Sequence, residues 1–496
     1  MHRITVSPYY TYDDVLIKPQ KSDIQSRKDV CLKTKLTDNI TLNMPLISSN
    51  MDTITEDRMA IEIARLGGLG ILHRYCTIQQ QVEMVKKVKR YTNYLITDPY
   101  TAHEHDFMEN VIHEIHNNNV DTLLIKDSED NLTGIFTKRD MIDYNRLKLL
   151  GHISENEDCV KDFMTKNPFS ISKEVFDKMS INTVIRIMTQ RKIQKLPILE
   201  NNSKAIHGLV TLKDALHRVD KTFMSKANLD DNSQLVVGAA IGVNKDYLER
   251  ANALINAGCD VICVDVAHGH HTLCANAVIE LRAKYPTLNI IAGNVCTAEG
   301  VRFLADAGAD CIKVGVGPGS ICTTRKKTGC GIPQFSAVLE CSEQAKQSNV
   351  TIIADGGHNR TIGNIFKALC AGASACMLGG SLSGTLETPG LVYTKLDKKV
   401  KQIRGMAGIL ANYNKSAKMG QDTSYLEDIT PEGVEGYVPY KGPVKDIIQQ
   451  IEGGIRSGMS YVGCSKLNSL KYRKIEFALI TSNGFRESGS HNITEM

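Results

Sequence analysis

The sequence predicts an α/β fold in which eight parallel strands, each followed by a helix, close into a (β/α)8 (TIM) barrel that carries an inserted second domain. Three observations predict it: eight short apolar runs, helix-periodic segments between them, and one long break in this rhythm. The runs are rich in β-branched residues, and many end in Gly or a small polar residue. They lie at residues 45–50, 68–73, 235–242, 261–267, 289–295, 311–317, 351–357 and 375–380.

Segments with helical periodicity lie between the later runs, at residues 246–257, 298–307 and 362–371. All three end with an Ala that is followed by a Gly, at positions 258, 308 and 372. Such a Gly is the natural left-handed cap of a helix, and a buried-looking strand follows each one. Eight units of this kind indicate a closed barrel. A doubly wound open sheet ranks second, because no Gly-x-Gly-x-x-Gly follows the first strand.

The composition is that of a large globular protein. The chain has 496 residues, 42% of them hydrophobic and 23% charged, which is too long for one ordinary domain. Its net charge of +4 gives no strong field toward nucleic acid or a membrane surface, and no apolar run approaches the ~20 residues that span a bilayer. The start lacks an apolar signal core, and the 14 Cys include no Cys-x-x-Cys pair. We therefore expect a cytoplasmic protein with reduced thiols.

The barrel rhythm stops over residues 94–227, which is long enough for a separate domain. We expect a first barrel part at 1–93 and a second one, with a flap and a C-terminal segment, at 228–496. Two similar phrases in the insertion place Thr137 before Asp140 and Thr211 before Asp214. A hydroxyl and a carboxylate so placed suit a ribose, whereas the alternative is that they cap helices.

The two phrases, with Lys195-Leu-Pro197 ahead of the second, resemble a tandem CBS pair, also called a Bateman module. This resemblance implies that the insertion binds adenine or guanine nucleotides, which would regulate the barrel. It does not identify the nucleotide.

The densest chemical signal is the loop Gly315-Val-Gly-Pro-Gly-Ser-Ile-Cys-Thr-Thr-Arg325, which directly follows a predicted strand. At the carboxyl end of a barrel strand, the backbone N–H groups of such a loop can hold a phosphate, and Ser320 adds a hydroxyl. Cys322 then lies where barrel enzymes carry active-site residues, and its thiol can add to an electron-poor purine carbon. The alternative, a small buried thiol like many others, fits this loop less well.

Loops after later strands point to the same mouth of the barrel. Asp355-Gly356-Gly357 offers a carboxylate for a ribose diol, and Gly379-Gly380-Ser381 offers a second phosphate cradle. Either loop can also be ordinary turn chemistry. Asp265 and Asn294 lie at the ends of two other strands. The order of the two glycine loops along a barrel favours one shared phosphate site.

Two other features favour plain structural readings. His268, His270 and His271 lie on a turn without a Cys or carboxylate partner at ligand spacing, which favours a polar loop over a metal site. The basic run at residues 325–327 is too short for a nucleic-acid patch.

Six motifs together are highly specific. They are Thr11-Tyr-Asp-Asp-Val-Leu16, Asn50-Met-Asp-Thr53, Gly317-Pro-Gly-Ser-Ile-Cys-Thr-Thr-Arg325, Ala354-Asp-Gly-Gly357, Arg404-Gly-Met406 and Glu432-Gly-Val-Glu-Gly-Tyr-Val-Pro-Tyr-Lys-Gly442. In these motifs the chain resembles the IMP dehydrogenase/GMP reductase family over nearly its whole length. The insertion lies where the dehydrogenases carry their CBS pair.

The resemblance implies roles for the residues at the barrel mouth. Cys322 would form a covalent thioimidate at purine C2, and Thr324 with Glu432 would move protons beside the C2 leaving group. Asp355 would hold the ribose. The implied phosphate contacts are Ser320, Gly357, Gly379, Gly380 and Ser381, and the implied base contacts are Ser49, Met51, Gly405 and Met406.

Cofactor and cation contacts are also implied by the resemblance. Asp265, Asn294, Gly315 and Gly317 would face a nicotinamide cofactor. Main-chain carbonyls of Gly317, Gly319 and Cys322 would hold a monovalent cation such as K+. Glu487 and Ser488, in the C-terminal segment, would complete that cation site from a neighbouring subunit.

Two reactions of the family share the covalent adduct. The dehydrogenase oxidises IMP and then hydrolyses the adduct with a flap Arg–Tyr pair, whereas the reductase expels ammonia from GMP and then delivers hydride. Aligned backward from Glu432 without gaps, that pair falls on Lys418 and Met419. Lys lacks the fork geometry of Arg, and Met cannot make the hydrogen bond of Tyr. The adduct should therefore hydrolyse poorly, which suits a reductase.

Several features resemble the dehydrogenases instead: the CBS pair, the flap length and the tail at residues 486–492. At two positions, however, the chain differs from the dehydrogenases, because Ile403 replaces a Tyr and Ala407 replaces a Gly. We favour a CBS-containing GMP reductase that uses NADPH and forms a homotetramer or, through CBS pairing, an octamer. An IMP dehydrogenase that uses NAD is the alternative. A catalytically silent nucleotide sensor ranks third, because Cys322, Thr324 and Glu432 are intact.

Overall fold

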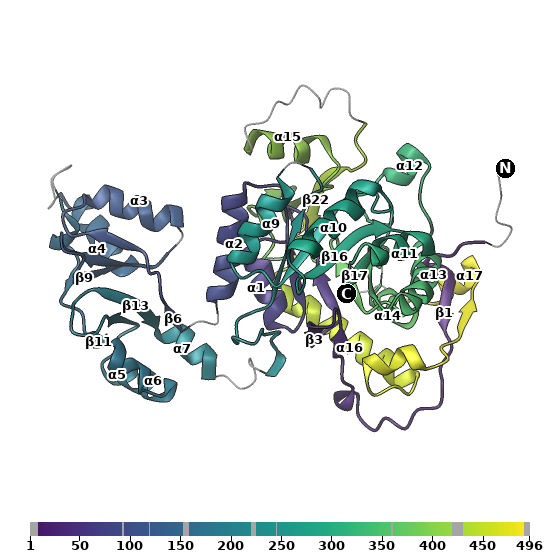
Figure 1. The fold of residues 1–496 in the computed structure, drawn as a ribbon, viewed down its shortest axis with the longest axis horizontal. Coiled ribbons are helices and arrows are strands. Elements are labelled where there is room, and N and C mark those ends of the chain that lie inside the picture. The colour runs from purple at the N-terminus through teal and green to yellow at the C-terminus, as the bar shows by residue number, and fades with distance from the viewer. Residues whose placement is uncertain are drawn as a thin grey trace. The chain divides into compact units, whose positions relative to one another are not determined.

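The structure is a computed structural model that describes residues 8–91, 94–118, 120–151, 158–219, 225–244, 246–358, 361–418 and 430–490. The chain forms two compact units, one from Met1–Lys89 with Lys226–Met496 and the other from Arg90–Ser225 (Figure 1). The first unit holds a closed barrel of parallel strands. A bilayer-spanning helix does not occur among the described residues.

Eight strands close the barrel in the order β14-β15-β16-β17-β18-β19-β4-β5, and β5 pairs with β14. Every predicted run contains one of them, so the predicted (β/α)8 barrel is confirmed. The strands are β4 (Leu46–Ser48), β5 (Leu69–Leu72), β14 (Val237–Ile241), β15 (Val261–Asp265), β16 (Asn289–Val295), β17 (Cys311–Val314), β18 (Thr351–Asp355) and β19 (Ala375–Leu378).

Helices surround the barrel (Figure 1). The three predicted helices correspond to α9, α11 and α14, and the glycines that follow them, Gly258, Gly308 and Gly372, have φ of +92°, +104° and +107°. The position at Gly372 also excludes a side chain sterically, because a Cβ there would lie 2.6 Å from the side chain of Ser342. The helices are α1 (Asp57–Arg65), α2 (Ile78–Arg90), α9 (Tyr247–Asn256), α10 (Thr272–Lys284), α11 (Ala298–Asp306), α13 (Gln334–Gln347), α14 (Ile362–Cys370) and α16 (Val444–Tyr461).

The barrel interior is filled by alternate residues of the strands. Val261 and Cys263 of β15, Ile291 of β16 and Met377 of β19 belong to one cluster of buried side chains. Leu36, Ile40 and Leu42 join the same cluster from the segment of β2 (Thr34–Lys35) and β3 (Thr41–Leu42). The barrel is therefore a packed core, and a ligand can approach only at its ends.

Shorter elements complete the first unit. Strands β20, β21 and β22 form an antiparallel sheet, and β1 pairs with β23. These elements are η1 (Tyr12–Asp14), β1 (Val15–Ile17), η2 (Arg27–Asp29), α12 (Thr324–Thr328), β20 (Tyr393–Lys395), β21 (Lys398–Arg404), α15 (Ile409–Lys418), β22 (Glu435–Pro439), η5 (Leu467–Tyr472), β23 (Phe477–Leu479) and α17 (Ser482–Glu487).

The second unit consists of two similar halves, each with a helix, a hairpin and another helix in that order. The halves contribute two four-stranded sheets, β10-β9-β8-β7 and β11-β12-β13-β6. Its elements are β6 (Leu95–Ile96), β7 (Thr101–His103), α3 (Met108–Asn118), β8 (Thr122–Lys126), β9 (Leu132–Thr137), α4 (Lys138–Leu149), η3 (Val160–Asp162), β10 (Thr165–Lys166), β11 (Ile171–Ser172), α5 (Lys173–Asp177), α6 (Ile181–Gln190), β12 (Lys195–Leu199), β13 (Ile206–Thr211) and α7 (Leu212–Val219).

Truncation of a barrel core side chain should destabilise the fold. Ile291 is fully buried, and Ile291→Ala should lower the free energy of unfolding by about 2–5 kcal/mol, because it removes apolar contacts and leaves a cavity. The matched control is Ile279→Ala on α10, where the side chain is 51% exposed and the change should stay within about 0.5 kcal/mol. Urea unfolding of both variants measures the difference. Equal losses would contradict a packed barrel interior.

Candidate active site

A cavity of about 310 Å³ opens at the carboxyl ends of the barrel strands. Loops that follow β4, β5, β15, β17 and β18 contribute to its wall, together with Asn294 of β16 and two segments from the last third of the chain. Many residues predicted from the sequence meet here. They are Ser49, Met51, Asp265, Asn294, Gly315, Gly317, Gly319, Cys322, Thr324, Asp355, Gly405, Met406 and Glu432.

The predicted phosphate contacts do not line this cavity but adjoin its wall. A Cβ on Gly379 would lie 3.2 Å from the Met51 sulfur, and a Cβ on Gly356 would lie 3.1 Å from the side chain of Pro318. The loops that carry Gly379–Ser381, Gly356–Gly357 and Pro318–Ser320 are therefore in close contact with the cavity wall. Ser320 is exposed, and Gly357, Gly379, Gly380 and Ser381 are half-buried.

Cys322, Thr324 and Glu432 form a hydrogen-bonded chain. The Thr324 hydroxyl donates to Glu432 Oε2 at 2.7 Å, and the Cys322 sulfur lies 3.2 Å from the same hydroxyl. An ionised carboxylate can only accept, so the single hydroxyl proton of Thr324 points to Glu432. The thiol must then donate to the Thr324 oxygen. The arrangement provides a proton path from Cys322 through Thr324 to Glu432.

Backbone pairing brings these distant residues together. Cys322 and Gly433 form a β-bridge, in which the Thr323 N–H donates to the Glu432 carbonyl at 2.8 Å and the Val434 N–H donates to the Ile321 carbonyl at 3.0 Å. Backbones also approach closely behind the bridge, because a Cβ on Gly405 would lie 2.9 Å from the Cα of Gly433. A side chain at Gly405 would separate the two segments, which explains the Gly at this place.

A buried cation organises the carboxylates of the cavity. Lys313 of β17 is 2% exposed, and its ammonium lies 2.6 Å from Asp265 Oδ1 and 3.7 Å from Asp355 Oδ2. Burial opposes ionisation of Asp265, but the charges of Lys313 and Arg74 and a hydrogen bond from Asn50 outweigh it and hold the pKa of Asp265 below its usual value. Burial likewise opposes the charged form of Lys313, and the two carboxylates nevertheless raise the pKa of Lys313. Asp265 and Lys313 are therefore both charged at neutral pH.

Asn294 fixes Asp355 from the other side. Its side-chain amide donates at 2.8 Å both to Asp355 Oδ2 and to the Gly315 carbonyl. Within the described residues, the polar contacts of the Asp355 carboxylate use Oδ2. This leaves Oδ1 as the acceptor that can meet a pair of hydroxyl groups.

The sequence interpretation missed Lys313, Arg74 and Tyr75, which all line the cavity. Lys313 has a sequence signal, since it is a lone cation inside the apolar strand β17. Arg74 and Tyr75 follow β5 but carry no motif of their own. Buried Arg74 Nε has no hydrogen-bond partner among the described residues, so this donor is available to a ligand.

Other missed residues fix the rim. Arg404 Nε donates to Asp52 Oδ2 at 2.9 Å, and the Tyr75 hydroxyl donates to the Met406 carbonyl at 2.9 Å. Lys441 donates to the carbonyls of Gly380 and Ser381 at 3.3 Å and 3.1 Å. A positive charge thus lies directly behind the predicted phosphate loop.

The regulatory pairs predicted in the second unit act as helix caps in this structure. The Thr137 hydroxyl and backbone N–H donate to Asp140 Oδ2 at 2.7 Å and 2.8 Å, at the start of α4. At the start of α7 the Thr211 hydroxyl donates to Asp214 Oδ2, and the Asp214 N–H donates to Thr211 Oγ1 at 3.1 Å. The capping alternative is thus observed, and nucleotide binding by the same residues stays a prediction.

The remaining predicted residues lie elsewhere. Glu487 and Ser488 are exposed at the end of α17 and do not line the cavity. Met419 lies outside the described residues, whereas Lys418 is the exposed last residue of α15. His271 accepts a hydrogen bond from the Leu273 N–H at the start of α10, and the ring of His270 packs on Phe303, which fits the polar-loop reading.

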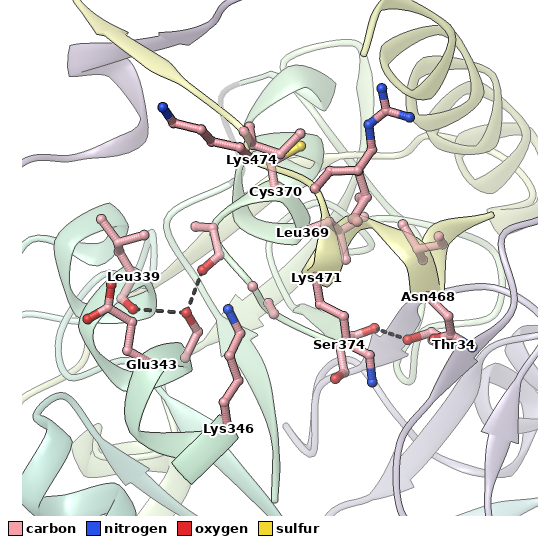
Figure 2. A pocket seen from close by; sticks show the side chains of 18 of the residues that line it. Thr34, Leu339, Glu343, Lys346, Leu369, Cys370, Ser374, Asn468, Lys471 and Lys474 are labelled. Carbon is pink, nitrogen blue, oxygen red and sulfur yellow. Dashed lines mark hydrogen bonds between the residues drawn. The ribbon is translucent and has the colours of Figure 1, made fainter. Parts of the chain in front are cut away.

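Another cavity, of about 240 Å³, involves residues of α13 and residues near the amino end of β19 (Figure 2). Thr34 donates to the Ser374 carbonyl at 2.7 Å in its wall, and Ser342 donates to the carbonyls of Leu339 and Ala371. Lys346, Lys471 and Lys474 surround it. None of the predicted site residues lies there, so the chemistry of the chain is concentrated at the carboxyl ends of the strands.

Comparisons with known proteins agree with this site. The model of the IMP dehydrogenase / GMP reductase domain matches residues 9–491. The chain is 41% identical to an inosine-5'-monophosphate dehydrogenase of Nitrosopumilus maritimus, over 98% of each chain. It is 42% identical to a GMP reductase of Leishmania donovani, over 98% of this chain and 97% of the relative.

Two solved structures of GMP reductase are also similar to this chain. A Cys-to-Ala variant of GMP reductase from Trypanosoma brucei, in complex with guanosine 5'-monophosphate, matches with a TM-score of 0.84 and 42% identity over 99% of each chain. GMP reductase from the same organism in complex with guanosine 5'-triphosphate matches with a TM-score of 0.74 and 36% identity, over 96% of this chain and 99% of the other.

Removal of the buried cation should leave two carboxylates without their partner. Lys313→Met should lower the free energy of unfolding by about 3–5 kcal/mol at pH 7, whereas Lys346→Met at an exposed position of α13 should change it by less than about 0.5 kcal/mol. Because the pKa of Asp265 is lowered by folding, the ion pair contributes above about pH 4 and loses its effect as the pH falls. The gap between Lys313→Met and wild type should shrink accordingly in acid. A gap that grows in acid would contradict the assigned charges.

Proposed function

Because the chain belongs to the IMP dehydrogenase / GMP reductase family, we propose that it is a GMP reductase, which converts GMP and NADPH into IMP, ammonia and NADP+. The observation that carries this choice is the flap sequence, in which Lys418 and Met419 stand where the dehydrogenases have their Arg–Tyr pair. Neither residue reproduces that pair, since Lys lacks the planar fork of Arg and Met has no donor. Water attack on the covalent adduct would then be slow.

The full-length match to a GMP reductase supports the proposal. The Leishmania donovani reductase aligns with 98% of this chain, so the alignment includes the inserted unit. The insertion therefore does not argue for a dehydrogenase. IMP dehydrogenase, which would oxidise IMP to XMP with NAD, is the second candidate because a relative of that name is 41% identical.

In the proposed reaction, the Cys322 sulfur bonds to purine C2 of GMP and the C2 amine leaves as ammonia. The thiol proton moves through Thr324 to Glu432, along the hydrogen bonds of 3.2 Å and 2.7 Å. The same pair then returns a proton to the departing amine, which is general acid catalysis of a poor leaving group. Hydride addition at C2 followed by release of Cys322 gives IMP.

Substrate binding would use the remaining residues at the barrel mouth. Asp355 Oδ1 would accept from the ribose hydroxyls, and Ser49, Met51, Gly405 and Met406 would enclose the base. The phosphate would lie on the loops of Ser320, Gly357 and Gly379–Ser381. The Lys441 ammonium behind Gly380 and Ser381 would favour its negative charge.

The described residues fit a nicotinamide cofactor. NADPH supplies the hydride when it is bound. Asp265, Asn294, Gly315 and Gly317 line the cavity together with Arg74, whose Nε has no partner among the described residues and would be a donor for a polar group of the cofactor. The carbonyls of Gly317, Gly319 and Cys322 are the proposed ligands of K+, with Glu487 and Ser488 from a neighbouring subunit of the tetramer.

We also propose that the second unit is a CBS pair that binds adenine or guanine nucleotides and regulates the barrel. Its capped helix starts lie in a charged environment: Asp121 forms an ion pair with Lys138, and the charges of Asp121 and Asp214 act on Lys195. Burial of Lys195 lowers the pKa of this residue despite those carboxylates. A desolvated ammonium next to Thr211 and Asp214 suits a nucleotide phosphate.

The direction of the reaction and the Thr324 relay can be tested together. The purified chain should oxidise NADPH in the presence of GMP, and Thr324→Val should lower kcat about 10²–10⁴-fold because the proton path is broken. Thr323→Val, in the same loop, should stay within about threefold of wild type. Release of XMP from IMP with NAD at a higher turnover would contradict the proposed function, and equal losses in both variants would contradict the relay.

A further inference from the structure

Two side chains that belong to no sequence motif connect the ends of three adjacent barrel strands. Gln334 is the first residue of α13 and is 2% exposed, and its amide donates to the carbonyls of Val314 and Asp355 at 2.8 Å and 3.3 Å. His358 is 1% exposed and lies with Nε2 3.1 Å from the Met377 carbonyl. Gln334 thus joins the end of β17 to β18, and His358 joins the loop after β18 to β19.

The protonation of His358 follows from its surroundings. A carbonyl can only accept, so Nε2 carries the proton. Burial is the largest influence on the ring and lowers the pKa of His358, so the ring is neutral at physiological pH. Nδ1 is then a bare acceptor, and it has no partner within the described residues, like the nearby hydroxyl of Tyr12. The Tyr12 and His358 rings lie 5.9 Å apart between centroids, which confines the imidazole.

This bond acts where backbone pairing stops. The ladder between β18 and β19 ends at the pair Asp355 and Met377, and Gly356 and Gly357 then turn away from the sheet with φ of +86° and +85°. The His358 side chain then connects this loop to β19 again, by its hydrogen bond to the Met377 carbonyl. A Cβ on Gly357 would lie 3.1 Å from Gln334 and 3.3 Å from the Tyr12 ring, so the loop packs tightly on both residues.

We infer that His358, together with Gln334, is a positioning residue that sets the spacing of the three glycine loops and thereby the affinity for the 5'-phosphate of the nucleotide. The loops after β17, β18 and β19 carry Ser320, Gly357 and Gly379–Ser381 in turn. Gln334 joins the last residues of β17 and β18, and His358 joins the loop after β18 to β19. The inference rests on the phosphate contacts of the proposed function. It does not depend on which reaction follows binding.

The test compares a nucleotide with its nucleoside. Calorimetric titration of the full chain with GMP and with guanosine isolates the contribution of the phosphate. His358→Leu removes the donor but keeps bulk, and it should weaken GMP binding by about tenfold, the loss of one buried hydrogen bond, while guanosine binding changes by less than about twofold. His358→Gln places an amide donor near the former Nε2 position and should restore GMP binding to within about threefold of wild type.

Steady-state kinetics adds a second readout. The KM for GMP should rise in His358→Leu while kcat stays within about twofold, because His358 does not touch the reacting atoms. Equal weakening of GMP and guanosine, or no weakening at all, would overturn the inference. A wild-type chain that binds GMP no more tightly than guanosine would overturn the phosphate site itself, and the inference with it. A phosphate-dependent affinity in a chain that oxidises IMP would overturn only the proposed reaction and would support the inference.

Discussion

The site depends on one contact between distant parts of the chain, the β-bridge between Cys322 and Gly433. Two backbone hydrogen bonds hold the loop after β17 against the segment that follows the flap. Without them, the Cys322 thiol and the Glu432 carboxylate would belong to two independent mobile segments, and Thr324 could not bond to both. The Gly at position 405 allows this approach because no side chain separates the two backbones. The geometry of Cys322, Thr324 and Glu432 thus follows from secondary structure rather than from side-chain packing.

The carboxylates of Asp265 and Asp355 depend on a second feature of the site, the buried ammonium of Lys313. This ammonium lies 2.6 Å from Asp265 Oδ1 and 3.7 Å from Asp355 Oδ2, and it favours the ionised form of Asp265. Since Lys313 lies within a barrel strand, the charges are fixed to the most rigid part of the fold. Asn294 extends the network to the Gly315 carbonyl and so connects Asp355 to the start of the loop that carries Cys322.

Much of the fold was predictable from the sequence because short-range rules decide it. The apolar runs mark all eight strands, and most predicted ranges overrun the observed strands by one to three residues at an end, as at Gly315 after β17. The family resemblance is confirmed by the match over residues 9–491. Cys322, Thr324 and Asp355 were also predictable, since each lies in a motif.

Other features were not predictable, because they depend on long-range contacts. Arg404 meets Asp52 across most of the chain, and neither residue type has a pattern that names its partner. Gln334 and His358 form hydrogen bonds to backbone carbonyl groups of the strands. Every residue has such a carbonyl, so the sequence does not indicate which one accepts the bond. Lys313 was the exception, because a lone cation in an apolar strand signals a buried ion pair.

We propose that the bond between Cys322 and purine C2 is protected from water long enough for hydride to arrive. The most direct measurement is the product ratio when the purified chain is given excess GMP with limiting NADPH, so that the adduct must wait. Chromatography of the nucleotides should show IMP in proportion to the NADPH consumed, with no detectable XMP. Accumulation of XMP at a rate comparable to that of IMP would contradict the account.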